Sequence, residues 1–396
     1  MDLQRLVGSR AVFTRTLLAC YGITAAIHLA SLLLNTLLPF HVVALGGSKT
    51  QVGLLFSVMT VVSMFLRPLV GGWIDRFGAR PVIVPGIASL TVTSLAFQLA
   101  ATPAAVILLM VGIGLSNGLI STSSSVIAAR ASAPEHRGEA LGTYYLASSL
   151  AAAVAPPLAF VLLRLGGVPL SFAVVTVVAL TMAGGVLALP PSTAAAVGGA
   201  LPALRLWSRS AVPVSCALIL TTIGHSSIYA FLPLYGTSHG QGRAVVWFFT
   251  VYPLSLIACR ALSRGVSDRV GRAHVVLPAM ALTAAGFFAL ALSPTPGSLI
   301  AAALLLGSGG AVLYPTLAAL VVDRAPEGER GLALGTLSGA WDFGVVVGSA
   351  LVGFVVERAS YGAGFALGGA TAALGVLWFF AAEQHHGRRL GAMRAT

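Results

Sequence analysis

The stretch Gly71-Gly72-Trp73-Ile74-Asp75-Arg76-Phe77-Gly78-Ala79-Arg80-Pro81 lies between two long apolar runs, so it indicates a tight, charged turn between two membrane helices. Its Asp-Arg-x-Gly core returns 193 positions later as Asp268-Arg269-Val270-Gly271. A second pair of turns repeats as well, because Arg137 and Arg330 each follow an Ala-Pro-Glu sequence and are also 193 positions apart. Two separate turns repeated at one spacing indicate that the chain is a duplicated unit.

The composition is that of a membrane protein. Hydrophobic residues make up 57% of the 396 residues and charged residues 9%, whereas a soluble domain carries roughly a quarter charged residues. The net charge of +12 does not indicate nucleic-acid binding, because the arginines are spread over short loops and form no patch. The three cysteines all fall in apolar runs and show no metal spacing. No phosphate-binding loop or nucleophile–base arrangement is present, so we expect no cofactor, no bound metal and no enzymatic activity.

Segments of about 20 apolar residues can span a bilayer as helices. The sequence predicts twelve of them, at 16–40, 50–74, 81–100, 104–127, 141–163, 168–190, 211–236, 243–263, 274–293, 298–321, 332–356 and 361–382. The predicted fold is therefore an all-α membrane protein with two pseudo-symmetric six-helix bundles. We expect the first bundle in 1–190, a cytoplasmic linker in 191–210, the second bundle in 211–382 and a cytoplasmic tail in 383–396.

The positive charges predict the orientation. If the N-terminus is cytoplasmic, only four of the 23 Lys and Arg residues fall on the outer side, namely Lys49, Arg164, Arg243 and Arg358. The other nineteen lie on or near the inner side, as the positive-inside rule requires. An even number of spans then places both termini in the cytoplasm, and we expect a multi-pass protein of an inner, cytoplasmic-type membrane.

Twelve helices in two halves, with this turn between the second and third, resemble the major facilitator superfamily along essentially the whole chain. Gly71, Asp75, Arg76, Gly78 and Arg80 fit that family's loop motif, and the second copy fits it in part. The resemblance implies two bundles around a central cavity that opens alternately to either side. It extends to the family's bacterial proton-coupled efflux permeases, with two departures. The best-fitting stretch of helix 4, 114–118, has glycine where many of these exporters carry arginine, and the helix 5 stretch 151–157 has alanine where they carry glycine.

The resemblance makes Asp75 a gate residue. Its carboxylate would face the N-terminus of helix 11, where free N–H groups and the helix dipole favour negative charge. Asp268 would be its counterpart in the second repeat. The alternative is that both are turn residues that set topology. The gating set that we predict comprises Gly71, Asp75, Arg76, Gly78, Arg80, Asp268, Arg269, Arg67, Arg260, Arg137 and Arg330.

Arg67 and Arg260 lie eight residues before the two aspartates, which is about 12 Å along a helix. They could clamp an anion, but such residues more often snorkel or pair within a gate. Their repetition favours a structural role in both halves.

Asp342 is the acidic residue with the strongest functional signal. The ten other acidic residues fall in loops, tails or helix ends, whereas Asp342 lies about ten residues into a predicted helix. A charge at that depth is costly and should face a cavity or a partner. Ser338, Asp342 and Ser349 share one helix face. We interpret Asp342 as a proton carrier or as the counter-ion of a cationic substrate; the alternative is a structural hydrogen bond.

Two histidines lie within predicted helices 1 and 7. His28 shares a face with Ser31 and Asn35, and His225 shares one with Thr222 and Tyr229. Histidine titrates near physiological pH and could relay protons or bind substrate. Each could equally be a packed, hydrogen-bonded residue.

Further polar residues of helices 4, 5 and 10 are candidates for the cavity wall. Asn117, Ser121 and Ser124 share a face of helix 4, helix 5 carries Tyr145 and Ser149, and helix 10 carries Tyr314. Hydroxyl groups are also common packing groups in membranes. A mildly polar cavity with aromatic sides suits a small amphipathic solute.

The sequence therefore predicts a secondary transporter that exchanges protons for a small organic solute in the direction of export, with the lipid bilayer as its surroundings and a monomer as its expected state. The rivals among transporters are uptake or efflux of a sugar, an amino-acid-like solute or a metallophore. A membrane receptor that binds without transporting is a rival of another class, which the duplicated turn argues against. A membrane-embedded enzyme is a third, which the lack of a catalytic constellation argues against.

Overall fold

The computed structural model describes residues 14–132, 137–189, 207–263, 266–292, 295–326 and 329–395, apart from the side chains of 75, 137–139, 267–268 and 386–395. Every regular element in these ranges is helical. The chain divides into two compact units, residues 1–47 with 58–200, and residues 48–57 with 201–396. Ser48 and the first nine residues of the helix that begins at Lys49 thus belong with the second unit.

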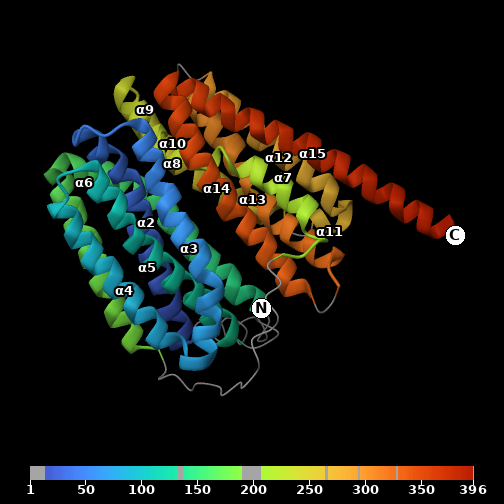
Figure 1. Ribbon diagram of the computed structural model, residues 1–396, viewed down its shortest axis with the longest axis horizontal. Helices are drawn as coiled ribbons and strands as arrows, with labels where there is room; N and C mark the ends of the chain where they lie inside the picture. Colours follow the sequence, from blue (N-terminus) through green and yellow to red (C-terminus); the bar gives the residue numbers. More distant parts are fainter. Residues whose placement is uncertain are drawn as a thin grey trace, which may run out of the picture. The chain divides into compact units, whose positions relative to one another are not determined.

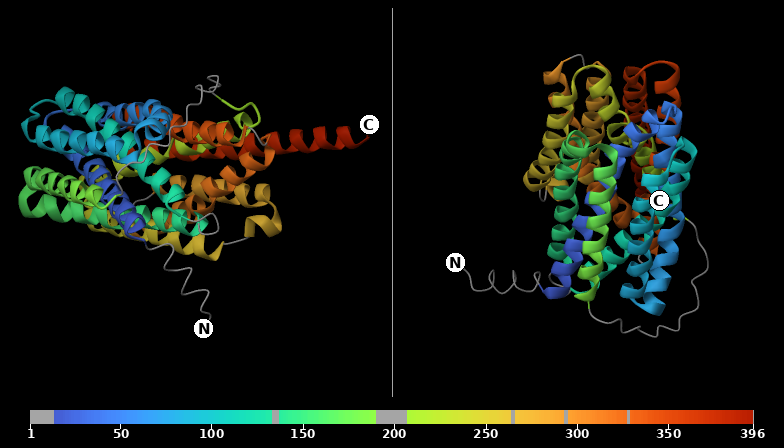
Figure 2. Two further views of the ribbon diagram at one scale, coloured as in Figure 1. Left: turned by 90° about the horizontal axis from the view of Figure 1, so that it is seen from below. Right: turned by 90° about the vertical axis from the view of Figure 1, so that its left-hand side faces the viewer.

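The helices follow the predicted spans closely (Figures 1 and 2). The first part of the chain forms α2 (Arg15–Ala44), α3 (Lys49–Phe77), α4 (Ala79–Ala96), the 3-10 turn η1 (Phe97–Leu99), α5 (Pro103–Arg130) and α6 (Arg137–Leu187). The second part forms α7 (Val212–Thr222), α8 (His225–Ala230), α9 (Leu232–Ser238), α10 (Gly242–Leu262), α11 (Val266–Val270), α12 (Arg272–Ala291), α13 (Pro296–Arg324), α14 (Arg330–Arg358) and α15 (Tyr361–Ala395). In both figures α15 runs past the other helices of its unit.

Eleven helices in the described ranges are long and apolar enough to cross a membrane. One of these, α6, contains two of the predicted spans, because Gly166 and Gly167 leave helical geometry in its middle. Gly167 has a φ of 65°, which L-residues with side chains rarely adopt. With α6 counted as two, the helices match the twelve that the sequence predicts.

Helix starts repeat at the spacing of 193 residues. Thr102 caps α5 by accepting a hydrogen bond from a backbone N–H, and Pro103 is the first helical residue. Thr295 and Pro296 begin α13 in the same way. A Thr cap satisfies a free N–H, and Pro at the first position loses no hydrogen bond.

Close helix crossings repeat as well. A Cβ on Gly114 of α5 would lie 2.6 Å from the Met59 carbonyl of α3, and one on Gly307 of α13 would lie 2.5 Å from the Tyr252 carbonyl of α10. Both residues of each crossing are 193 positions from their counterparts. Small residues let helix backbones approach in a membrane, where the lipid is as apolar as the side chains.

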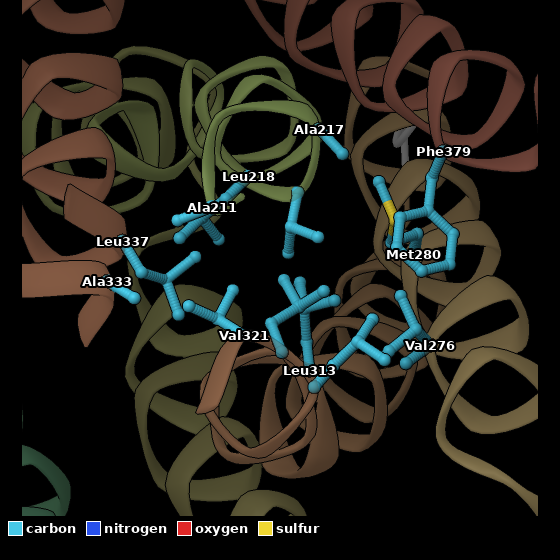
Figure 3. Packing of buried hydrophobic residues seen from close by; sticks show 14 of the residues in the cluster. Ala211, Ala217, Leu218, Val276, Met280, Leu313, Val321, Ala333, Leu337 and Phe379 are labelled. Atoms are coloured by element: carbon cyan, nitrogen blue, oxygen red, sulfur yellow. The ribbon is translucent and has the colours of Figure 1, made fainter. Parts of the chain in front are cut away.

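Each unit has its own apolar core. In the second unit, side chains of α7, α12, α13, α14 and α15 meet in one cluster that includes Leu218, Met280, Leu313, Leu337 and Phe379 (Figure 3). This packing holds α14 against α7 and α13, and so fixes the position of the polar residues that α14 carries.

Candidate functional site

The acid that the sequence singles out is buried. Asp342 lies within α14 and is 5% exposed. The two serines of its helix face have partners on different helices. The Ser338 hydroxyl lies 2.8 Å from the Tyr314 hydroxyl of α13, and the Ser349 hydroxyl lies 2.7 Å from that of Ser57 in α3. The predicted polar stripe therefore exists, with Asp342 between two hydrogen-bonded hydroxyl pairs.

Aromatic rings from four helices gather beside this stripe. The Trp341 ring packs edge-on against His225 of α8, with centroids 5.1 Å apart, and against Tyr314 of α13, at 5.7 Å. His225 also approaches Tyr252 of α10, at 6.5 Å. His225, Tyr314 and Trp341 are half-buried, and Tyr252 is buried. The sequence analysis missed Trp341 and Tyr252; the signal that could have found Trp341 is its place directly before Asp342.

The helix that carries His225 is interrupted by short turns. The predicted single span 211–236 consists of α7, α8 and α9, and two residues in turn conformation, Ile223 and Gly224, separate α7 from α8. Ile223 and Gly224 keep helical backbone angles, so the shared helix face of Thr222, His225 and Tyr229 stays a prediction. The backbone of Gly348 in α14 lies directly against Ile223 at this point. Tyr229 is half-buried and packs on Phe249 of α10, at 5.7 Å between centroids.

In the first unit, α2 and α5 share a hydrogen-bonded polar group. The Ser31 hydroxyl donates to Oδ1 of Asn117 over 2.9 Å, and the Asn117 amide donates to the Ile113 carbonyl. The His28 ring nitrogen Nδ1 lies 2.8 Å from the Thr24 carbonyl of its own helix. Asn35 is 9% exposed, and its Oδ1 has no hydrogen-bond partner among the described residues.

The other predicted wall residues mostly bond within their own helices. Ser121 donates to the Asn117 carbonyl, and Ser149 donates to the Tyr145 carbonyl over 2.9 Å. Tyr145 is 52% exposed. Ser124 is buried, and its carbonyl accepts from the Cys20 thiol.

The glycines of the two repeated turns have equivalent geometry. Gly78 has a φ of 83° and precedes α4, and Gly271 has a φ of 95° and precedes α12. Only glycine adopts such angles readily. Gly71, in contrast, is helical and has open space around it. The duplicated motif therefore produces the same turn twice.

The structure describes only some of the charged side chains in these two turns. The Arg76 guanidinium lies 5.3 Å from the Phe77 ring centroid. Arg80 is half-buried, and Arg269 and Arg330 are exposed. The predicted gate carboxylates Asp75 and Asp268 lie outside the described side chains, as does the Arg137 side chain.

The repeated arginines upstream of the turns are both half-buried and both lie near a tyrosine. Arg67 of α3 is half-buried and interacts electrostatically with Tyr144 of α6. Arg260 of α10 is half-buried, donates from Nε to the Ala311 carbonyl over 3.2 Å and interacts with Tyr252.

Two ion pairs that the sequence analysis missed join three helices of the second unit. Arg272 pairs with Asp323 and Arg324 pairs with Glu383, each at 2.7 Å. These contacts connect the start of α12 to the end of α13, and the end of α13 to α15. Arg272 lies one position before the alanine that replaces the last arginine of the motif, so the basic side chain of this turn is displaced by one residue.

Comparison with known proteins decides the family. The model of the Major Facilitator Superfamily matches residues 20–264 and 214–395. The chain belongs to the major facilitator superfamily. An uncharacterized MFS-type transporter of Burkholderia pseudomallei is 26% identical over 366 residues, which are 89% of this chain and 88% of that protein. The uncharacterized MFS-type transporter YhhS of Escherichia coli K12 is 24% identical over 324 residues, 80% of this chain and 79% of that protein.

Solved transporters share the fold. The nucleoside transporter NupG gives a TM-score of 0.72 at 17% identity, over 93% of this chain and 99% of that one. The peptide transporter POT in complex with sulfate gives 0.77 at 14% identity, over 93% and 94%. This transporter is thus a multi-pass membrane protein of the MFS type, and its substrate is a small molecule.

Proposed function

We propose that this transporter exports a small amphipathic or cationic organic solute in exchange for protons, by alternating access. The observation that carries the proposal is the burial of Asp342 within a membrane helix. Low polarity around a carboxyl group disfavours its charged form, so a buried acid can bind and release a proton reversibly during the cycle. Asp342 is the proposed coupling group, with the half-buried His225 beside its neighbour Trp341 as a second titratable group.

The second repeat alone carries this acid. The position 193 residues before Asp342 is Ser149, whose hydroxyl bonds to its own helix. A single carboxylate in a duplicated framework marks a place where the two units have diverged in chemistry. We assign proton coupling to the second unit for this reason, and assign to Asn117, Ser31 and Asn35 of the first unit a part in binding polar groups of the solute.

The proposed gate is the turn that follows α3. Asp75 would face the start of α14 in one state and lose this contact in the other, with Gly71, Arg76, Gly78 and Arg80 shaping the turn. The proposed setting is an inner, cytoplasmic-type membrane with both termini in the cytoplasm, and a monomer as the working unit.

The test is transport by purified protein in proteoliposomes under an imposed pH gradient. Panels of organic cations, sugars, amino-acid-like solutes, nucleosides and small peptides are offered in turn, and accumulation against the solute gradient is measured. We expect one class to accumulate only while the pH gradient lasts. Accumulation that continues after an ionophore has removed the pH gradient would overturn proton coupling. Asp75→Asn should abolish transport without lowering expression, and a fully active variant would remove Asp75 from the gate.

A further inference from the structure

One helix of this transporter is shared between its two units. α3 is continuous from Lys49 to Phe77, yet residues 48–57 belong to the second unit, whereas the rest of the helix belongs to the first. The first unit holds the helix closely, because the Ser63 hydroxyl donates to the Gly114 carbonyl of α5 over 2.9 Å. In an alternating-access cycle, the start of α3 is therefore the part that has to leave the second unit.

The packing at the start of α3 can separate without moving large side chains. Gly53 lies against Gly353 and the Ser349 carbonyl of α14. Glycine lets two helix backbones approach closely and leaves no side chain to withdraw when they part. The polar groups at the first turn of α3 are therefore best placed to control the separation.

The last turn of α14 brings a carboxylate to this first turn. Glu357 accepts a hydrogen bond from the Thr50 N–H over 2.8 Å, and it also interacts with the Ser48 and Thr50 hydroxyls and with the Lys49 N–H. N–H groups at a helix start have no partner within their own helix, and the helix dipole favours negative charge there. Glu357 is exposed, so water can replace it when α3 moves away.

The start of α3 has a second cap that is its own. The Ser48 N–H donates to Oε1 of Gln51 over 2.9 Å, and the Gln51 N–H donates to the Ser48 hydroxyl over 3.2 Å. This reciprocal pair is a capping box, and both of its members move with α3. Glu357 is thus additional to the cap of the helix, which favours a role in holding two helices together.

The same turn also contacts α15. The Lys49 ammonium lies 4.6 Å from the centroid of the Tyr361 ring. Tyr361 packs edge-on against Tyr235 of α9, with centroids 6.0 Å apart, and against His239, at 6.1 Å. A cation over an aromatic face is attracted to it, and the neighbouring rings hold that face in position.

The equivalent positions of the other repeat do not have this chemistry. The spacing of 193 residues relates Thr50 to Arg243, and Arg164 to Glu357. Both counterparts are arginines, and an arginine side chain cannot accept a hydrogen bond from a helix N–H. The contact is therefore a property of α3 and α14, and the duplication of the fold does not account for it.

We propose that Glu357 and Tyr361 form a latch that holds the first turn of α3 on the second unit, and that the latch must open before α3 can part from α14. Charge keeps it closed, through the carboxylate on the helix N–H groups and through the Lys49 cation on the ring. This inference goes beyond the proposed proton exchange, because the latch needs neither the solute nor Asp342.

The test measures how often α3 parts from α14. With the native cysteines replaced, Ser57→Cys is treated with a water-soluble maleimide in lipid nanodiscs, which expose both faces of the protein. Ser57 is only 8% exposed, so a cysteine there reacts in molecules in which the helices have parted, and the rate reports their fraction. We expect Glu357→Ala to raise this rate about three-fold, and Glu357→Ala with Lys49→Ala about ten-fold, because each change removes one exposed charge contact. Glu357→Gln keeps an acceptor without the charge and should give a smaller increase.

Two controls separate a latch from ordinary stabilisation. Gln51→Ala removes the cap that belongs to α3 itself, so it should lower the melting temperature and leave the Ser57→Cys rate unchanged. Ser63 lies six residues further along the helix and is 4% exposed, but its hydroxyl bonds within the first unit. A Ser63→Cys thiol should therefore react at the same rate with and without Glu357→Ala.

An unchanged Ser57→Cys rate in folded Glu357→Ala would overturn the proposal. So would an equal increase at Ser63→Cys, which indicates general loosening, or an equal increase with Gln51→Ala, which indicates that only the capping of the helix matters. A melting curve for each variant confirms its fold, and Glu357→Gln decides the question if Glu357→Ala does not fold. None of these results bears on proton exchange, and a failure of proton exchange in proteoliposomes would leave the latch in place.

Discussion

Gly78 is the residue on which the geometry of the first turn depends. Its φ of 83° and ψ of 169° fall in a region that is essentially reserved for glycine, where another residue costs about 1–3 kcal/mol. We expect Gly78→Ala to lower the melting temperature of the purified transporter by several degrees. Gly71→Ala is the control from the same motif, because Gly71 is helical with open space around it, and alanine favours a helix over glycine by about 1 kcal/mol. Equal melting temperatures for the two variants would show that the turn does not require glycine.

Single residues are also where prediction from sequence succeeded least. Asp342 stood out because an acid in a long apolar run is costly, and the structure does place it in a buried position. Trp341 and Tyr252 went unnoticed because an aromatic residue in a membrane span is ordinary by composition. Only the crossing of α8, α10, α13 and α14 brings their rings near His225. Contacts between helices depend on their rotation and tilt, which the order of residues along one helix does not specify.

At the scale of the element, the first turns of α3 and the last turns of α14 form a close crossing. Gly53 lies against Gly353, and the Ser57 hydroxyl meets both the Ser349 hydroxyl and the Val346 carbonyl. Glu357 accepts a hydrogen bond from the Thr50 N–H over 2.8 Å, so it also satisfies a free donor at the start of α3.

This crossing should open during transport, because it covers the part of α14 that follows Asp342. With the native cysteines replaced, the double variant Ser57→Cys with Ser349→Cys should form a disulfide. The hydroxyl oxygens of Ser57 and Ser349 are 2.7 Å apart in the unaltered protein, and a sulfur–sulfur bond spans about 2 Å. We expect oxidation to reduce transport to the level of empty liposomes and dithiothreitol to restore it, while each single variant stays active. Full transport by the oxidised, cross-linked protein would show that the crossing need not separate.

The helices themselves were predictable, because each span is long, apolar and bounded by charges or turn residues. The breaks within them were harder to predict. Gly166 and Gly167 interrupt α6 at a place that the sequence marks as a short gap, whereas Ile223 and Gly224 interrupt a run with no charge or proline at the break. Gly348 of α14 lies against Ile223 at that second interruption, a contact between helices that the sequence does not specify.

At the scale of the whole molecule, the internal repeat carried the prediction of fold and family. One spacing of 193 residues relates the turn glycines Gly78 and Gly271, the Thr-Pro helix starts and the glycine crossings of α5 and α13. A repeat constrains the architecture of both halves at once. It says little about the solute, because the groups that we propose to bind it lie where the halves differ, as Asp342 and Ser149 do.

The orientation in the membrane is a second property of the whole chain. In intact cells of a cysteine-free variant, we expect Arg243→Cys to react with a membrane-impermeant maleimide and Arg76→Cys to react only after permeabilisation. Both arginines are exposed, so accessibility to the reagent depends on the side of the membrane. Labelling of Arg76→Cys in intact cells would contradict the topology that the positive charges predict.

We propose that a proton carried by Asp342 drives the movement of the solute. The most direct measurement is the internal pH of proteoliposomes, followed with an entrapped dye while an organic cation is added, for wild type beside Asp342→Asn. Asn has nearly the shape of Asp but cannot carry a proton. We expect a proton flux that begins when the cation is added to wild type and is absent in Asp342→Asn, although the variant still exchanges the cation down its gradient. Equal proton flux in both proteins would contradict proton coupling through Asp342.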